Sequence, residues 1–217
     1  FDPDETQVDW NGDGTTGDAG DVKGFLPIGS NSPHFTGSYD GQGHSIKNVY
    51  IDSSEQYVGL FGRVDEGGIF QNIAIINAGV IQDTANDGRA GLAVGLLGGT
   101  INQVSAQGGI EGDRVGGLVG QLSAGSQILD SRSDAVITGI GDGADGIGGL
   151  VGMADGSGSA AAFSIVRSFA IGSLIDNFSS SPVGGLIGDV GTGTLTVSGS
   201  YYLDALASQS AAGDPKT

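Results

Sequence analysis

The sequence contains no cysteine and few basic residues, and both absences limit what the protein can do. Without cysteine it forms no disulfide bond, holds no metal through thiolates and uses no cysteine nucleophile. Eight lysines and arginines stand against 25 aspartates and glutamates, which gives a formal charge of −17 at pH 7. Nucleic acids and anionic membrane surfaces repel a chain with this charge. We therefore expect no nucleic-acid partner.

Long apolar runs and helical patterns are missing too. The longest apolar stretch, Ala90–Ile101, is too short to span a bilayer, so we expect no direct membrane insertion. No segment shows apolar residues at helical spacing together with capping signals. Nothing at Phe1 resembles a signal peptide, and we expect a mature protein or a segment of a larger one. The 43 glycines are accompanied by 38% hydrophobic residues, which is enough for a packed core.

A short glycine–leucine phrase recurs five times along the chain. It reads VGLFG at Val58–Gly62, VGLLG at Val94–Gly98, GGLVG at Gly116–Gly120 and Gly148–Gly152, and GGLIG at Gly184–Gly188. The copies follow one another at intervals of 22 to 36 residues, and a second apolar segment comes after each. Self-similarity at such a period is typical of stacked repeats. The sequence therefore predicts an all-β fold, a single right-handed parallel β-helix of about five to six coils with an N-terminal cap.

Stacked coils predict ladders of equivalent residues in the core. Adjacent side chains on a strand face opposite ways, so Leu118 and Val119 are both buried only if the chain bends between them. The flanking glycines permit such a bend at a corner of the coil. One ladder is expected from the repeat leucines Leu60, Leu96, Leu118, Leu150 and Leu186. A second is expected from Ile73, Val104, Ile128 or Leu129, Ile165 or Val166, and Val197.

The composition divides the chain into three predicted parts. Residues 1–35 are interpreted as an N-terminal cap with an acidic loop, residues 36–204 as the solenoid, and residues 205–217 as a C-terminal tail. The first part has no glycine–leucine phrase but holds Trp10 and three of the five prolines. A solenoid needs an end piece, because an open end exposes strand edges and apolar side chains.

The predicted cap contains a candidate calcium site. The segment Asp9–Gly14 (DWNGDG) matches the first half of a calcium loop, in which oxygen ligands at alternate positions turn toward one hard cation. Gly20 stands where such loops carry glutamate, so another ligand would have to complete the site. We predict that Ca²⁺ is held by Asp9, Asn11, Asp13 and either Asp18 or Asp21. The alternative is an Asx-rich turn without an ion.

Two other polar segments have only a superficial likeness to functional sites. Gly141–Gly146 resembles a calcium-binding nonapeptide repeat but occurs once, and a solvated turn is the better interpretation. Asp40 and His44 are close in sequence, but acid–base catalysis would require them to meet around a substrate with shifted pKa values. Only two histidines exist, His34 and His44, so no metal triad or Ser-His-Asp set is indicated. We predict no catalytic residues and no enzymatic activity.

Three parts of the sequence together resemble a known repeat family. The glycine–leucine phrases, the segment Phe35–Ile51 (FTGSYDGQGHSIKNVYI) and the segment Ser200–Gln209 (SYYLDALASQ) are similar to the GLUG-motif repeats of large bacterial surface proteins. These include filamentous haemagglutinin-like adhesins and the non-catalytic region of immunoglobulin-A-type peptidases. The resemblance extends from about Phe25 to Gln209.

The resemblance implies a function and a location. It implies a non-catalytic structural or adhesive module of an exported bacterial protein, extracellular at the cell surface, that serves as a rigid spacer or binding platform in cell adhesion or biofilms. The expected partners are other repeats of a larger surface protein, or neighbouring copies stacked by ends or edges. An extracellular glycan or protein receptor is a further expected partner.

Two alternative functions remain open from the sequence. A carbohydrate-active β-helix enzyme, such as a lyase or glycosidase, would need converging carboxylates beside a basic or aromatic groove, and the basic residues are scattered. An ice- or crystal-binding surface would need a regular outward array of threonines. Only Thr192, Thr194 and Thr196 alternate, on a single strand.

Overall fold

The protein folds entirely as β-structure wherever its structure is described. The computed structural model describes residues 23–30, 32–82, 87–140, 146–156, 161–176 and 182–203, and within these ranges it contains strands and no α-helix. None of these residues belongs to a helix long and apolar enough to cross a membrane. The all-β prediction is confirmed.

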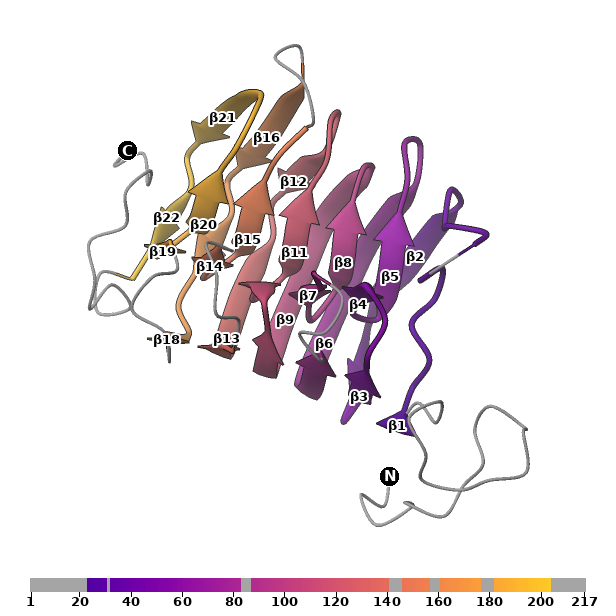
Figure 1. Cartoon of the computed structure of the whole chain (residues 1–217). Helices are drawn as coiled ribbons and strands as arrows, with labels where there is room; N and C mark the ends of the chain where they lie inside the picture. Colours follow the sequence, from indigo (N-terminus) through magenta and orange to yellow (C-terminus); the bar gives the residue numbers. More distant parts are fainter. Residues whose placement is uncertain are drawn as a thin grey trace.

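The strands form three sheets that run along the length of the molecule (Figure 1). Sheet A comprises β1 (Lys23–Gly24), β2 (Ser38–Lys47), β3 (Tyr50–Ser53), β6 (Ile69–Gln82), β9 (Thr100–Gly112), β12 (Gln127–Leu129), β13 (Arg132–Gly139), β16 (Ala162–Val166), β17 (Phe169–Ala170), β18 (Ser173–Asp176), β21 (Thr194–Ser198) and β22 (Tyr201–Tyr202). Sheet B comprises β5 (Phe61–Val64), β8 (Val94–Leu97), β11 (Val119–Leu122), β15 (Val151–Ala154) and β20 (Ile187–Val190). Sheet C comprises β4 (Tyr57–Val58), β7 (Arg89–Gly91), β10 (Arg114–Gly116), β14 (Ile147–Gly148) and β19 (Val183–Gly184).

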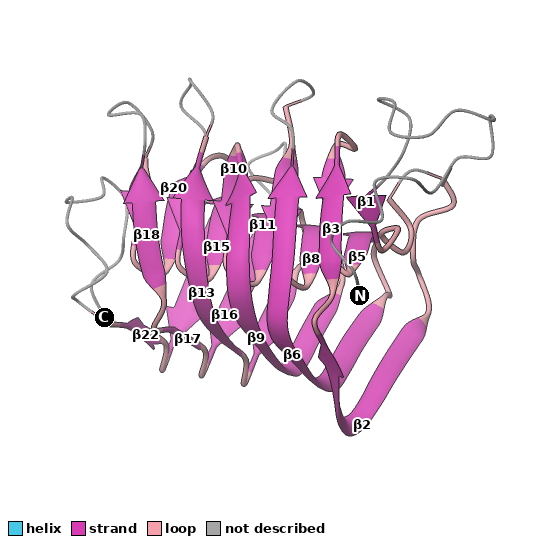
Figure 2. Cartoon of the chain, turned by 90° about the horizontal axis from the view of Figure 1, so that it is seen from below, coloured by secondary structure: helices cyan, strands magenta, loops and turns pink. Residues whose placement is uncertain are grey.

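The chain visits the three sheets in the same order in every coil. It passes from sheet C through the glycine–leucine phrase into sheet B, crosses to the long strands of sheet A, and returns to sheet C. Neighbouring coils pair in parallel, so that Val119 stacks on Val94 on one side and on Val151 on the other. The long strands of sheet A lie side by side over one face of the molecule (Figure 2). The predicted parallel solenoid of about five coils is confirmed, and its right-handed sense stays a prediction.

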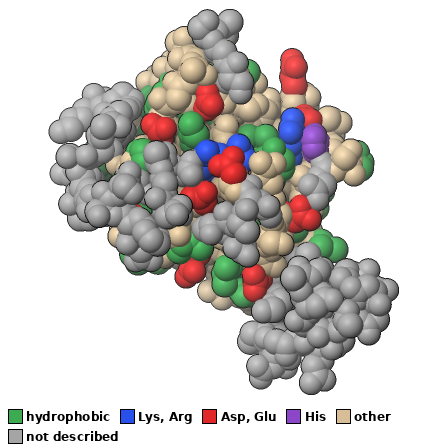
Figure 3. All heavy atoms as spheres, in the orientation of Figure 1, with side chains coloured by type: hydrophobic (Ala, Val, Ile, Leu, Met, Phe, Trp, Pro, Cys, Tyr) green, Lys and Arg blue, Asp and Glu red, His purple; other side chains and the backbone are tan. Residues whose placement is uncertain are grey.

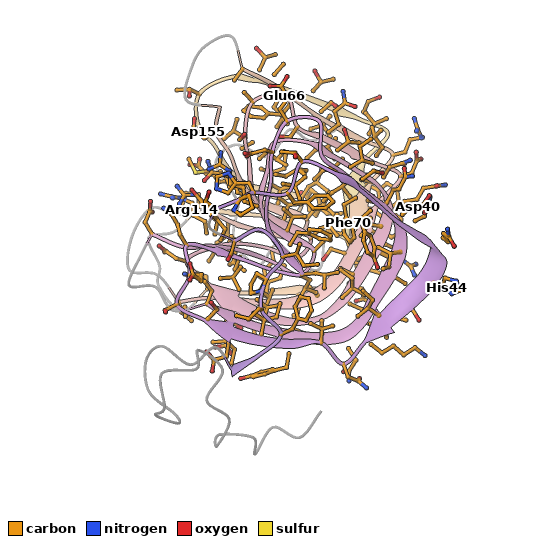
Figure 4. The ribbon with its side chains drawn as sticks, turned by 90° about the vertical axis from the view of Figure 1, so that its right-hand side faces the viewer. Asp40, His44, Glu66, Phe70, Arg114 and Asp155 are labelled. Atoms are coloured by element: carbon orange, nitrogen blue, oxygen red, sulfur yellow. The ribbon has the colours of Figure 1, made fainter. Side chains whose placement is uncertain are left out.

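The core is a set of apolar ladders inside the coils. Seen from the N-terminal end, Phe70 lies inside the coil, whereas Asp40 and His44 point away from it (Figure 4). The register of sheet A places Phe70, Ile101, Ile128, Ile165 and Val197 in one inward ladder. Ile128 and Ile165 are thus the inward residues of their pairs. Ile73 and Val104 belong instead to the adjacent ladder, so the predicted second ladder was wrong at its first two positions.

The repeat leucine of the second coil was also placed wrongly. In the structure Leu96 pairs with Arg63 and Gln121, and although only 8% exposed it lies outside the main core cluster. The corner of this coil is formed by Leu92, whose carbonyl oxygen accepts a hydrogen bond from the Leu60 amide. The sequence reads Gly-Leu twice in succession here, and the first copy occupies the corner. All five repeat leucines are buried as predicted, but only the other four lie at the corner.

Glycine is required where sheets B and C meet. A Cβ atom on Gly116 would lie 2.1 Å from the carbonyl oxygen of Val119 and 2.4 Å from the amide nitrogen of Gly152. One on Gly120 would lie 2.6 Å from the amide nitrogen of Ala90. The backbones of the two sheets therefore touch at these positions, which leaves no room for any side chain. This contact explains why glycines flank the leucine in the repeated phrase.

A second corner divides each crossing of sheet A. It is formed by residues in the left-handed conformation, with φ between 48° and 59°: Asn72, Gln103, Asp130, Arg167 and Gly199. The next residue in each coil points inward, and in the last three coils it is serine. The Ser131, Ser168 and Ser200 hydroxyl oxygens each accept a hydrogen bond from a backbone amide of the preceding coil, at 3.0 to 3.1 Å. Each hydroxyl oxygen thereby supplies an acceptor in the hydrogen-bond ladder between coils, at a position that backbone carbonyl groups alone would leave unfilled.

Residues 23–30 and 32–35 cover part of the first coil. β1 pairs with β3 in antiparallel fashion, which reverses the direction used by the other strand pairs. Ile28 and Phe35 form bridges to Phe61 and Val64, and the Phe35 and Phe61 rings lie 4.8 Å apart. Most of the predicted cap, residues 1–22, and the predicted tail lie outside the described residues. The three part boundaries therefore stay predictions.

Candidate functional site

The predicted calcium ligands, Asp9, Asn11, Asp13, Asp18 and Asp21, all lie outside the described residues. So does Gly141–Asp145, which is most of the second acidic loop. Within the part of the chain that the structure describes, no group of three or more histidine, aspartate or glutamate side chains could hold a metal ion. The calcium site stays a prediction.

Asp40 is a hydrogen-bond acceptor at a bulge of β2. Its carboxylate accepts from the Gln42 amide at 2.8 Å, from Asn72 Nδ2 at 3.0 Å and from Gln71 Nε2 at 3.1 Å. The Asn72 hydrogen bond, followed by the one from Gln42, lowers the pKa of Asp40. A carboxylate with these three donors and a lowered pKa is a poor proton acceptor. None of the donors is His44, and the two side chains point outward at different places (Figure 4).

An open hollow of about 440 Å³ adjoins Asp40. Amide and hydroxyl side chains line it, chiefly Gln42, Asn72, Gln103 and Ser105. Among the described residues that line it, Asp40 is the one carboxylate, and none is basic or aromatic. Hydrolysis of a glycosidic bond needs two carboxyl groups on opposite sides of the bond. This hollow therefore lacks the chemistry of a glycosidase site.

Three arginines meet on the face formed by sheets B and C. Tyr57, Arg89 and Arg114 stand one above another in sheet C, and the guanidinium groups of Arg63 and Arg89 lie 5.7 and 5.5 Å from the centre of the Tyr57 ring. Asp87 accepts from Arg114 Nη1 at 2.7 Å and lies 3.5 Å from Arg89 Nη2. Positive and negative side chains accordingly gather together on this face (Figure 3).

The arginine cluster corrects the expectation that basic residues are scattered. Its sequence signal is the position of Arg89 and Arg114, each of which comes directly before an apolar residue and a glycine, Ala90-Gly91 and Val115-Gly116. Stacking of equivalent positions brings them together. The Arg114 guanidinium group binds Asp87, and that of Arg89 lies over the Tyr57 ring. Arg89 Nε also donates to Gln121 Oε1 at 2.6 Å. These contacts tie neighbouring coils together.

A smaller charged cluster lies at the N-terminal end of this face. Asp65 accepts from Arg63 Nε at 2.6 Å and is 2.9 Å from His34 Nδ1. Burial by itself would raise the pKa of Asp65, but the hydrogen bonds from Arg63 and His34 outweigh it and the pKa is lowered. His34 belongs to the segment that covers the first coil, so Asp65 fastens that segment to the solenoid.

A second hollow, of about 200 Å³, lies on the outer face of sheet A. Gly79 and Gly109 form part of its floor, with Tyr50, Glu111 and Val136 around it. Burial, followed by the charges of Asp52 and Glu111, raises the pKa of Tyr50. The described residues of this hollow include one aromatic ring and one carboxylate, and no pair of converging carboxylates.

Comparison with known proteins relates parts of the chain to two much longer ones. Halomucin from Haloquadratum walsbyi is 40% identical over 118 residues, which cover 52% of this chain and 1% of halomucin. A protein of Evansella cellulosilytica, whose name describes it as a Gly-rich membrane protein, is 36% identical over 53 residues. These cover 24% of this chain and 6% of that protein. No protein-family model and no solved structure matches the chain.

Proposed function

We propose that the protein is a non-catalytic structural module of the GLUG-repeat type in a surface-associated protein. It acts as a rigid spacer or platform that carries binding surfaces away from its attachment point. Its role is structural, because the solenoid fixes the distance and orientation between the parts of the protein at its two ends.

The observation that carries this proposal is the continuity of the core along the solenoid axis. In-register ladders such as Ile101, Ile128 and Ile165 connect every coil to the next, and these side chains are fully buried. Backbone contacts between sheets B and C and the serine ladder add further links between coils. A body held together in this way resists bending, since bending would open close-packed contacts.

The names of the two relatives support a location at the cell surface. One is called halomucin and the other is described as a membrane protein. Both are far longer than the matched segment, which agrees with a module repeated or embedded in a large protein. We also propose an adhesive role, and this rests on the resemblance of the glycine–leucine phrases to the GLUG-motif repeats of adhesins.

The two alternatives have less support. The described hollows lack paired carboxylates, as an enzyme of glycosidic bonds would require. Thr194 and Thr196 are exposed on β21, but their partners in the neighbouring strand are Ala162 and Ser164. The threonines therefore form no repeated outward array.

Labelling of intact cells tests the location. Antibodies raised against this chain should label unpermeabilised cells that produce the complete natural protein, and surface proteolysis should remove the signal. A cytoplasmic protein labelled in parallel is the control for cell integrity. Labelling that appears only after permeabilisation would contradict the proposal. New reducing ends released from polysaccharides by the purified chain would favour the enzyme instead.

A further inference from the structure

Gly109, inside β9, is a glycine that the fold itself does not require. A Cβ atom there would meet no atom within 4 Å, and its φ lies outside the left-handed region. Of the described glycines, two others have as much room, Gly43 and Gly67, and both have positive φ values, 77° and 83°. Glycine weakens a strand, and in a strand interior it often marks a place where a ligand approaches the backbone. A ligand that contacts the backbone would account for Gly109.

The hollow of about 200 Å³ on sheet A surrounds this glycine. It follows one row of outward positions that are in register on β3, β6, β9 and β13, four strands that lie side by side (Figure 2): Tyr50, Gly79, Gly109 and Val136. The Tyr50 ring leans toward Gly79, so that its Cδ2 atom would lie 3.2 Å from a Cβ atom there. Val136, which is 50% exposed, stands on the other side of Gly109. The two glycines thus form a depression between an aromatic and an aliphatic side chain.

The next outward row supplies a carboxylate and more apolar surface. Ile81, Glu111 and Thr138 are in register with one another and also line the hollow. Burial, followed by the charges of Asp52 and Glu111, raises the pKa of Tyr50, so both carboxylates act on this place. Among the described residues that line the hollow none is basic, and the whole chain has a formal charge of −17. The electrostatic field at the hollow therefore attracts cations and repels anions.

The size of the hollow favours one inserted side chain over a whole small molecule. Pockets for drug-sized ligands usually have volumes of about 300–1,000 Å³, which is more than this hollow provides. Of the two basic side chains, lysine has the longer apolar stem. That stem can pack on Ile81 and Val136 while the ammonium group reaches Glu111.

We propose that this hollow is a docking site for a lysine side chain of a basic partner polypeptide. The lysine stem lies on the two glycines, between Tyr50 and Val136. Its ammonium group pairs with Glu111. The missing side chains at Gly79 and Gly109 let the stem contact the backbone of the sheet. This inference rests on the proposed function, because it names one binding surface that the platform carries.

Titration of the full chain with a lysine peptide tests the proposal. The probe is the tripeptide acetyl-Gly-Lys-Gly-amide, and the readout is the amide nuclear magnetic resonance spectrum of the ¹⁵N-labelled protein. The amide signals of Gly79, Gly109 and Val136 should shift in a saturable manner. The dissociation constant should be about 1–10 mM, since one exposed ion pair and a short apolar stem give weak binding. The same peptide with Nε-acetyl-lysine has lost the charge and should leave these signals unchanged.

Three variants locate the binding on the chain. Gly109→Leu fills the hollow and should abolish the shifts at Gly79 and Val136, with the melting curve as the check on folding. Glu111→Gln removes the paired carboxylate and should weaken binding about threefold to fivefold. The matched control is Glu66→Gln, which removes an exposed carboxylate between β5 and β6 and changes the net charge equally. It should bind the peptide as the unmodified chain does.

Two results would overturn the proposal. Equal binding of the acetylated peptide would show that the hollow does not recognise an ammonium group. Shifts that spread over the acidic surface, and that Glu66→Gln and Glu111→Gln reduce equally, would show that net charge alone attracts the peptide. Antibody labelling of cells is unaffected by either result, so this failure and that of the proposed function are distinguishable.

Discussion

Replacing Gly116 with alanine should break the contact between sheets B and C. The new Cβ would lie 2.1 Å from the Val119 carbonyl oxygen and 2.4 Å from the Gly152 amide nitrogen. Both atoms belong to the backbone and neither can rotate aside. To reach an ordinary van der Waals contact, the two strands must move apart by about 1 Å, and the close-packed core has no free volume for this movement.

The cost follows from this displacement. Overpacking a close-packed interior usually costs about 1–3 kcal/mol, and we expect the upper part of this range because backbone and not side chain must move. For a chain of this size, a loss of about 2–3 kcal/mol corresponds to a fall in melting temperature of about 4–12 °C. The loss should appear in equilibrium unfolding by urea with the far-ultraviolet spectrum still that of β-structure.

Gly109→Ala is the matched control. Gly109 also lies in a strand, but a Cβ there would meet no atom within 4 Å. Because alanine restricts the unfolded chain more than glycine, this variant should be neutral or up to about 1 kcal/mol more stable. If the two variants melted at the same temperature, the glycine–leucine phrase would not be a place of backbone contact and our account of it would be wrong.

Three further predictions concern the core, the cap and the effect of pH. Leu118→Ala should cost about 2–5 kcal/mol and Leu96→Ala at most about half as much, since Leu118 is fully buried in the core cluster and Leu96 is outside it; equal losses in urea titrations would contradict the observed register. Millimolar calcium should raise the melting temperature, magnesium should do so less, and Asp13→Ala should lose most of the effect; a melting curve that is the same in chelator and in millimolar calcium would exclude the site. Because the pKa of Asp65 is lowered in the folded protein, its stabilisation is present above the ordinary carboxyl pKa and disappears as the pH falls through the lowered value. Asp65→Asn should therefore weaken the acid dependence of the melting temperature below about pH 5, and an unaltered dependence would argue against the Arg63 contact.

The solenoid could be predicted because its signals are local and repeated. Glycine on both sides of a leucine marks a corner wherever it recurs, and the corner of each coil has the same geometry. Gly116 and Leu118 illustrate this, since the glycine is needed for backbone contact and the leucine is fully buried. Both requirements are set within a few residues of chain.

The misplacement of Leu96 shows what local patterns leave undetermined. The second coil offers two successive glycine–leucine pairs, and either could form the corner by its sequence alone. The choice follows from neighbouring coils, because Val94 stacks between Phe61 and Val119 and thereby assigns the corner to Leu92. Register across coils of unequal length is a long-range property.

The arginine cluster and the serine ladder were missed for the same reason. Arg89 and Arg114 are 25 residues apart in sequence, and Ser131 and Ser168 are 37 apart. Loops of different length hide the equivalence of such positions until the coils are aligned. Once the register is known, both groups can be read from the sequence.

The central claim, parallel in-register stacking of coils, can be measured by disulfide trapping. The chain has no cysteine of its own, so any disulfide that forms comes from the introduced cysteine pair. Thr100 and Gln127 are outward partners in adjacent strands, about 4.8 Å apart, which is within the range of Cα separations that a disulfide spans. Asn102 and Gln127 are offset by two positions, roughly 8 Å apart, which a disulfide does not span without backbone movement. We predict that the Thr100→Cys/Gln127→Cys pair oxidises rapidly within one chain and the Asn102→Cys/Gln127→Cys pair slowly; faster oxidation of the offset pair, or equal rates, would contradict the stacking.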